Sequence, residues 1–301
     1  MDIRMAKYTL PDKPMVIVTS APLQGPLHVL LVGAGGNGAR VMPPLMQMLR
    51  PGDAVAVIDH DIVEDRNLAR QHFTERDIGR HKAIVLAERY RRSGIHVTAF
   101  AQQVTAETAP QLLVALNHAP NRVWISCVDN WQARASIRGI VDRLGSNTAW
   151  IDVGNEMRGG QVLMSLRSWV LRVSGLATIS GASNVRLSLD AFHAMPQLLR
   201  AQSWNCIPCG IRNAAGADSC TGCHQPQASC GQRIDLQTVM VNHMAAASAI
   251  NCLSWLMLGI PFTSCGAFFS TLNTMQPIPI TGCDSIGNLL PDTTFALPDE
   301  A

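Results

Sequence analysis

Residues 27–38 read LHVLLVGAGGNG, an apolar run that ends in a cluster of glycines. Such a run is typical of a strand that is buried on both faces of a parallel sheet. The glycines place backbone N–H groups at the start of a helix, whose positive end can hold phosphate oxygens. The stretch therefore predicts a nucleotide-binding turn formed by Gly33, Gly35, Gly36 and Gly38.

The chain after this turn alternates between helical patterns and apolar runs. We expect helices at 37–49, 82–92, 106–117, 131–144 and 234–258, and strands at 27–32, 54–58, 95–101, 123–127, 149–153, 161–166, 169–173, 267–271 and 277–280. Alternating strands and helices predict an α/β fold with a Rossmann-like, doubly wound and mainly parallel sheet. Pro43 and Pro44 lie inside the first helix, and we expect them to kink or shorten it.

Composition divides the chain into four parts. Residues 176–233 are rich in Gly, Ala, Ser, Gln and Cys, which predicts a cysteine-rich crossover insertion over the nucleotide site. It separates a nucleotide-binding core at 25–175 from a C-terminal part at 234–301 that completes the same domain. Residues 1–24 form an N-terminal segment.

The charge balance excludes several classes of partner. The chain has 24 basic and 22 acidic residues and a net charge of +2, so we expect no nucleic-acid or anionic membrane partner. The N-terminus lacks the apolar run of a secretory signal, which predicts a cytoplasmic protein. Residues 239–258 are apolar but contain Asn242, His243 and Asn251, so we expect a buried helix instead of a membrane span.

Charged and amide side chains follow the second predicted strand. Asp59 comes at its end, where a carboxylate can bind the ribose of either NAD or ATP. Residues 59–71 read DHDIVEDRNLARQ, and Lys82 follows them. This set has more cationic and amide groups than hydride transfer needs, and it favours a triphosphate.

These motifs resemble those of the ThiF/MoeB/HesA family and of the adenylation domains of ubiquitin-activating enzymes. That family has GxGGxG, then DxDxVxxxNLxRQ, then a lysine, and each element is present here. The resemblance continues at residues 126–134, SCVDNWQAR, and at residues 152–154, DVG. It therefore covers about residues 27–166.

The resemblance implies an ATP site in which Asp59 binds ribose, Asn67 holds phosphate, and Arg70, Lys82 and Asp129 are catalytic. Asp129 would also coordinate Mg²⁺. Two cations and a metal suit the attack of a carboxylate on an α-phosphate, because negative charge grows at phosphorus. The full expected ATP-binding set is Gly33, Gly35, Gly36, Gly38, Asp59, Asp61, Asn67, Arg70, Gln71, Lys82, Asp129 and Asn130.

Four of the nine cysteines form two CxxC pairs. Their spacing predicts one structural Zn²⁺ held by Cys206, Cys209, Cys220 and Cys223, with a redox pair as the alternative. Including Asn213, the spacing is similar to Ran-binding-protein-type zinc fingers. It departs from the usual ThiF pattern, in which the two pairs lie much farther apart.

Cys230 lies seven residues beyond the second pair and shortly before the long apolar helix. In this position it resembles the catalytic cysteine of some single-domain activating enzymes. A helix N-terminus and nearby Arg233 would lower the pKa of its thiol. The alternative is a structural loop cysteine.

The resemblance implies activation of a ubiquitin-like protein that ends in glycine. Adenylation, a thioester on Cys230 and transfer to a conjugating enzyme would follow in turn, catalysed by a homodimer. The helix after residue 230 also looks like ThiF-type members of bacterial ubiquitin-like conjugation clusters, which leaves antiviral defence and cofactor synthesis open. The alternatives are a sulfur-carrier adenylyltransferase without a thioester, an NAD-dependent oxidoreductase and a silent scaffold.

Overall fold

The computed structural model describes most of the chain. The described residues are 17–20, 23–69, 71–91, 94–116, 120–145, 147–155, 159–174, 185–200, 204–205, 209, 211–225, 239–270, 275–283 and 288–291.

Five parallel strands form the nucleotide-binding half of the sheet. They are β2 (Leu27–Val32), β3 (Ala54–Ile58), β4 (His96–Phe100), β5 (Asn121–Ser126) and β6 (Thr148–Asn155), in the order β4-β3-β2-β5-β6. β2 pairs with β3 on one side and with β5 on the other, so the strand order reverses at β2. Ligands of open α/β sheets bind at such a reversal, outside the carboxyl ends of the strands.

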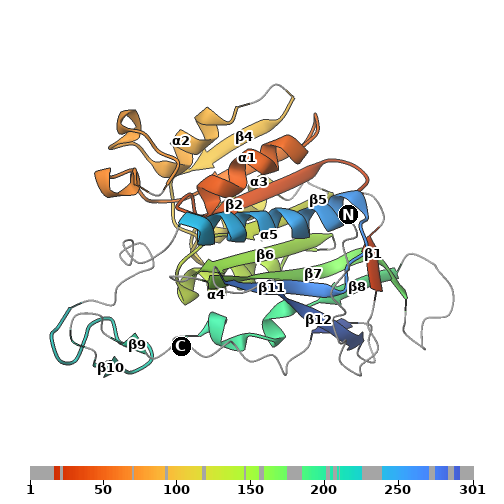
Figure 1. Cartoon of the computed structure of the whole chain (residues 1–301). Helices are drawn as coiled ribbons and strands as arrows, with labels where there is room; N and C mark the ends of the chain where they lie inside the picture. The colour runs from red at the N-terminus through yellow and green to blue at the C-terminus, as the bar shows by residue number, and fades with distance from the viewer. Residues whose placement is uncertain are drawn as a thin grey trace, which may run out of the picture.

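The α-helices of the described residues are α1 (Gly38–Met48), α2 (Lys82–Arg89), α3 (Ala109–Leu116), α4 (Trp131–Val141) and α5 (Val239–Leu258). α1 and α5 lie side by side on one face of the sheet (Figure 1). α1 continues through Pro43 and Pro44, so of the two expected effects, a kink or a shortening, the shortening was wrong. Its buried residues Met42, Leu45 and Met46 pack into the core, and this packing outweighs local helix propensity.

β7 (Gly159–Ser174) joins the parallel half to the rest of the sheet. It pairs antiparallel with β6, β8 (Val185–Leu189), β1 (Ile17–Ser20) and β11 (Ser264–Ser270). The strands predicted at 161–166 and 169–173 are therefore one strand. Ser168 has a φ of +44°, and the register shifts between Leu166 and Trp169, so the break is a local irregularity.

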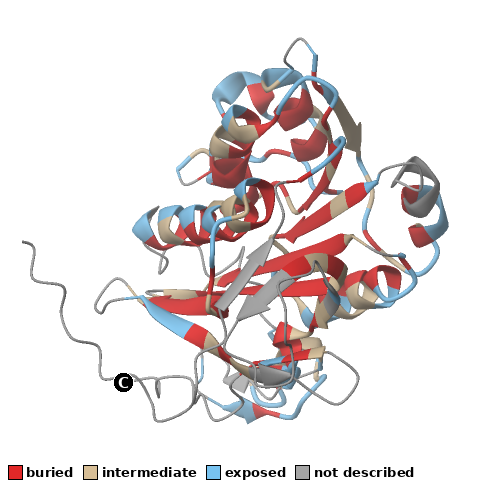
Figure 2. Ribbon diagram, turned by 90° about the vertical axis from the view of Figure 1, so that its right-hand side faces the viewer, coloured by how far each residue is buried: buried red, intermediate tan, exposed pale blue. Residues whose placement is uncertain are grey.

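The 11-stranded sheet is mixed, so the expectation of a mainly parallel sheet holds only for its nucleotide-binding half. β12 (Gln276–Cys283) and β13 (Asn288–Pro291) complete it. β8 lies within the predicted insertion yet belongs to this sheet. Buried residues concentrate along the central strands and on the helix faces that meet them (Figure 2). β9 (Trp204–Asn205) and β10 (Arg212–Asn213) form a separate two-stranded sheet.

α5 is the buried helix that the sequence predicts. Its residues Val241, Ala245, Ala249, Leu253 and Leu256 are fully buried, and the helix contacts β6, β7 and β11. Among the described helices, none has the length and apolar character needed to cross a bilayer.

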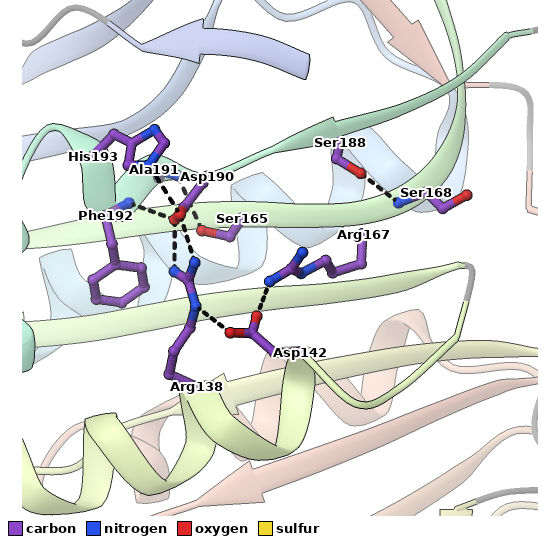
Figure 3. Close-up of polar contacts among 10 residues, drawn as sticks. All are labelled: Arg138, Asp142, Ser165, Arg167, Ser168, Ser188, Asp190, Ala191, Phe192 and His193. Atoms are coloured by element: carbon purple, nitrogen blue, oxygen red, sulfur yellow. Dashed lines mark hydrogen bonds and ion pairs between the residues drawn. The ribbon is translucent and has the colours of Figure 1, made fainter. Parts of the chain in front are cut away.

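An ion-pair cluster ties α4 to the segment after β8 (Figure 3). Arg138 donates to both carboxylate oxygens of Asp190, at 2.8 and 2.6 Å. It also donates to Asp142 at 3.0 Å, and Asp142 pairs with Arg167. Burial raises the pKa of Asp190, but the hydrogen bonds and charge of Arg138 outweigh it, so this pKa lies below its ordinary value.

Candidate nucleotide-binding site

In the glycine turn between β2 and α1, backbone atoms leave no space for a side chain at two positions. Gly33 has a φ of +91°, and a Cβ atom there would lie 2.6 Å from the carbonyl oxygen of Cys127. A Cβ atom on Gly38 would overlap the carbonyl oxygen of Gly33. The turn is therefore tight, and the absence of side chains leaves its backbone accessible to close approach by another group.

Asp59 fixes this turn to the end of β3. Its carboxylate accepts hydrogen bonds from the backbone N–H of Ala34 at 2.6 Å and of Asp61 at 2.7 Å. Burial raises the pKa of Asp59, and the two N–H donors oppose that shift only in part. The structure thus places Asp59 where the sequence predicts a ribose ligand, directly beside the turn.

Lys82 is held close to Asp59 through Asp61. The Lys82 ammonium lies 2.9 Å from the Asp61 carboxylate, and the Lys82 N–H donates to the Asp61 carbonyl, also at 2.9 Å. The lysine side chain is 7% exposed and the aspartate side chain 50%. This pairing gives the buried cation a partner and keeps it at the edge of the site.

Asn67 and Gln71 come from the loop between β3 and α2. Asn67 is buried, and its side-chain oxygen accepts from the Glu64 N–H at 2.9 Å, which closes a 3₁₀ turn at Asp65–Asn67. Gln71 is buried with its amide nitrogen 4.0 Å from the Cβ position of Gly35. Its side-chain oxygen accepts no hydrogen bond from the residues that the structure describes. Gln71 therefore reaches the turn, whereas Asn67 shapes the loop.

Asp129 and Asn130 follow β5, the strand beside β2. Asp129 is exposed, and it accepts from the Asn130 side chain at 3.2 Å. The Asn130 oxygen accepts from the Ala133 N–H at 2.8 Å and so caps α4. An exposed carboxylate at this edge fits a metal ligand, whereas the Asn130 oxygen is engaged in the cap.

A buried network supports the loop that carries Asp129. Arg134 donates to Asp152 at 2.9 Å and to the Val128 carbonyl at 2.9 Å. Asp152 also accepts from Ser126 at 2.5 Å. Residues 126–134 and 152–154 were singled out as motifs, and the structure joins them through this ion pair. Burial raises the pKa of the Cys127 thiol in the same loop, as expected for a core cysteine.

Three asparagines meet beside the turn, and the sequence alone did not bring them together. Asn155, at the end of β6, donates to the side-chain oxygens of Asn37 at 3.1 Å and of Asn242 at 2.5 Å. Asn242 comes from α5 and is 1% exposed. The available signal was a polar residue near the start of a mainly apolar helix.

Three of the four predicted zinc ligands lie together. The sulfur atoms of Cys209, Cys220 and Cys223 are within 4.8 Å of one another. Backbone N–H groups of Cys223 and Gly222 lower the pKa of the Cys220 thiol to about 6, which favours the thiolate that binds metal. Asn213 accepts from the Thr221 N–H at 2.9 Å and so braces this loop.

Three predicted site residues fall outside the described residues: Arg70, Cys206 and Cys230.

The fold has known relatives. It is similar to E. coli MccB solved with MccA-N7isoAsn, at TM-score 0.52 and 16% identity over 86% of this chain and 66% of MccB. E. coli MccB solved with succinimide gives TM-score 0.51 and 17% identity over 84% and 63% of the two chains. E. coli tRNA N6-threonylcarbamoyladenosine dehydratase, TcdA, is 26% identical over 42% of this chain and 52% of TcdA, at TM-score 0.37.

The match to TcdA thus spans about half of that protein. No curated protein sequence matches the chain. The ThiF family model matches residues 25–260, which include the glycine turn, the motifs at residues 59–71 and 126–134, and α5. The chain therefore belongs to the ThiF family.

Proposed function

We propose that the chain is an ATP-dependent enzyme that adenylates the C-terminal glycine carboxylate of a ubiquitin-like protein. One observation carries the proposal: Asp59 and Gln71 meet the glycine turn at the reversal of strand order, and Lys82 is held beside Asp59 through Asp61. Membership of the ThiF family supports an adenylating activity. The resemblance to ubiquitin-activating enzymes at residues 59–71 supports the substrate class.

In this reaction a carboxylate oxygen of the substrate attacks the α-phosphorus of ATP, and the bond to the β-phosphate oxygen breaks to release pyrophosphate. Asp59 would orient the ribose, while Lys82 and Arg70 would neutralise the charge that develops on the phosphate oxygens. Asp129 would hold Mg²⁺, which supplies further charge neutralisation when bound. Fixed charges in a partly buried site act strongly because little water screens them.

The second step would form a thioester. The Cys230 thiolate would attack the acyl carbon of the adenylate, AMP would leave, and a conjugating enzyme would then receive the acyl group. The position of Cys230, between the cysteine cluster and α5, supports this assignment. We further propose that the enzyme acts as a homodimer, as the resemblance implies, and that it acts in the cytoplasm.

We also propose that Cys206 completes a tetrahedral zinc site with Cys209, Cys220 and Cys223. The closeness of three sulfur atoms and the low pKa of the Cys220 thiol support it. Four thiolates from two CxxC pairs form a closed structural site with no open position for a substrate.

The main alternative keeps adenylation without the thioester, as in sulfur-carrier activation. The similarity to MccB is a fold similarity, and it is compatible with either substrate. An NAD-dependent oxidoreductase is disfavoured, because Gln71 at the turn and Lys82 beside Asp61 supply more polar groups than hydride transfer needs.

ATP–pyrophosphate exchange tests the first step. Purified enzyme is incubated with ATP, labelled pyrophosphate and either ubiquitin-like or sulfur-carrier proteins, each with and without its terminal glycine. We expect exchange only with an intact glycine terminus. Exchange that ignores the terminal glycine, or no exchange with any of these proteins, would contradict the proposal.

Gel analysis of a labelled ubiquitin-like substrate tests the second step. Wild-type enzyme should form an adduct that a reductant removes, and Cys230→Ala should form none while retaining exchange. Cys252→Ala is the matched control, because Cys252 is buried in α5. An adduct that persists in Cys230→Ala would refute the thioester assignment.

A further inference from the structure

The N-terminus of α1 is left open beside the glycine turn. Asn37 stands at the capping position, yet its side chain does not cap the helix, and the first turn contains no acidic residue. The Asn37 oxygen accepts from Asn155 instead. Over the residues that the structure describes, the N–H groups of Gly35 and Gly36 donate no hydrogen bond. These two N–H groups, which lead into the positive end of an 11-residue helix, therefore have no acceptor in that part of the chain.

Asn242 brings a second donor to the same place from α5. Its side-chain nitrogen has no hydrogen-bond partner in the described part of the chain, although the residue is 1% exposed. A Cβ atom on Gly36 would lie 3.1 Å from that nitrogen, so the amide packs directly against the turn. A buried donor without a partner is costly, and it indicates that a group outside the chain satisfies it.

In the asparagine network that the structure shows, the nitrogen end of the Asn242 amide lies toward the turn. Asn155 donates from one nitrogen to the oxygens of both Asn37 and Asn242. If the Asn242 amide were reversed, two nitrogen donors would face each other. The Asn242 oxygen accepts from Asn155, and the Asn242 nitrogen lies nearer the Cβ position of Gly36, at 3.1 Å, than the oxygen does, at 3.4 Å.

The nearby carbonyl group does not satisfy this donor. The Gly36 carbonyl oxygen accepts from the Arg40 guanidinium at 2.9 Å, and Arg40 also donates to His243 at 3.3 Å. Arg40 thus holds the turn from within α1. The turn presents N–H donors to a ligand, and Asn242 adds one more.

We propose that Asn242 is an anion-binding residue that donates to a phosphate oxygen of the nucleotide at the start of α1. This inference rests on the proposed function only for the identity of the ligand as a nucleotide. An anionic oxygen can accept hydrogen bonds from the backbone N–H groups and from the side-chain N–H. Its negative charge is also favoured by the helix dipole. A carboxylate oxygen of the acyl substrate could accept the same hydrogen bond. The test therefore contains nucleotides and no acyl substrate, so that any effect on binding comes from the nucleotide.

Calorimetric titration with adenosine and AMP tests the assignment. Adenosine shares the base and ribose of AMP but lacks the phosphate. In Asn242→Ala we expect AMP affinity to fall about tenfold or more, because a hydrogen bond to a charged group is lost, while adenosine affinity changes less than about twofold. Asn251→Ala, at an exposed position on the same helix, should leave both affinities unchanged.

Asn242→Asp is a second variant, which keeps the proposal testable if Asn242→Ala does not fold. It keeps the oxygen that accepts from Asn155 and replaces only the arm that faces Gly36. It should weaken AMP binding further, since like charges then face each other, and thermal unfolding of each variant reports whether the fold is kept.

If Asn242→Ala folds and the ratio of its AMP affinity to its adenosine affinity equals that of wild type, the proposal is overturned. This holds even if Asn242→Asp changes that ratio. If the alanine variant does not fold, an unchanged ratio in Asn242→Asp overturns it. A wild-type protein that binds neither nucleotide refutes this inference and the proposed function together. Selective loss of AMP binding, with no exchange on any ubiquitin-like protein, supports the role of Asn242 while removing the proposed substrate.

Discussion

The Lys82 ammonium lies 2.9 Å from the Asp61 carboxylate, with the lysine nearly buried and the aspartate half exposed. The half-exposed Asp61 carboxylate therefore neutralises the charge of the buried Lys82 ammonium. A nucleotide phosphate that enters the site would compete with Asp61 for the same charge.

Replacing Lys82 with Gln removes this charge and keeps most of the side-chain volume. We expect ATP affinity to fall about 10- to 100-fold, and the exchange rate to fall at least as much, because the charge assists the transition state. Calorimetry and ATP–pyrophosphate exchange measure the two effects. Arg80→Gln is the matched control, since Arg80 pairs with Glu88 at 2.6 Å on the exposed surface. If Lys82→Gln and wild type bind ATP with equal affinity, Lys82 does not contribute to the ATP site.

Replacing Gly38 with Ala should disrupt the turn. The added methyl group would overlap the Gly33 carbonyl, so we expect loss of AMP binding and a lower melting temperature. Gly139→Ala is the control, because Gly139 lies inside α4 with open space around it. That change should leave binding intact and stabilise the fold by up to about 1 kcal/mol. Normal AMP binding by Gly38→Ala would contradict the geometry of the turn.

The cysteine cluster predicts one zinc ion per chain. Elemental analysis of purified protein should find it, and Cys220→Ser should lose it, because a closed site needs all four thiolates. Cys252→Ala should keep the metal, since burial raises the pKa of that thiol to about 12 and it lies in α5. Wild-type protein purified without chelators that contains no zinc would refute the site.

The Arg138–Asp190 pair predicts a pH-dependent contribution to stability. The pKa of Asp190 is lower in the folded state than in the unfolded state, so the contribution is present above the unfolded pKa of about 4 and is lost as pH falls through the folded value. At pH 7 we expect Asp190→Asn to lower the free energy of unfolding by about 1–3 kcal/mol. The gap should narrow as the pH falls below the unfolded pKa of about 4.

Urea unfolding at several pH values measures this gap. Glu75→Gln, at an exposed position, should differ little from wild type at any pH. A gap between wild type and Asp190→Asn that stays constant from pH 7 to 3 would exclude the ion pair as its cause.

The nucleotide-binding half of the fold was predictable because strands buried on both faces appear as apolar runs. Residues 27–32 and 54–58 match β2 and β3 in full. β7 was predicted as two strands because Arg167 and Ser168 interrupt its apolar pattern, and a positive φ at Ser168 could not be inferred from a serine. The mixed half of the sheet depends on pairings between distant segments, which leave no local signal.

The candidate site likewise has a part that was predictable from local motifs and a part that depends on contacts between distant residues. Gly33, Asp59 and Lys82 lie in contiguous motifs, and the structure places them together. Asn242 contacts Asn155 across 87 residues of sequence, and Asn155 contacts Asn37 across 118. Such contacts depend on how α5 crosses the sheet, which the spacing of residues along the chain does not determine.

The position of β7 has a consequence for synthesis on the ribosome. Its residues 160–163 pair with β6 on one side and with β11 on the other. While β6 emerges just before β7, β11 begins only at Ser264, about 100 residues later. The growing chain therefore carries an unpaired strand edge while about 100 further residues are added, and a nascent chain that stalls before β11 is exposed to aggregation through that edge.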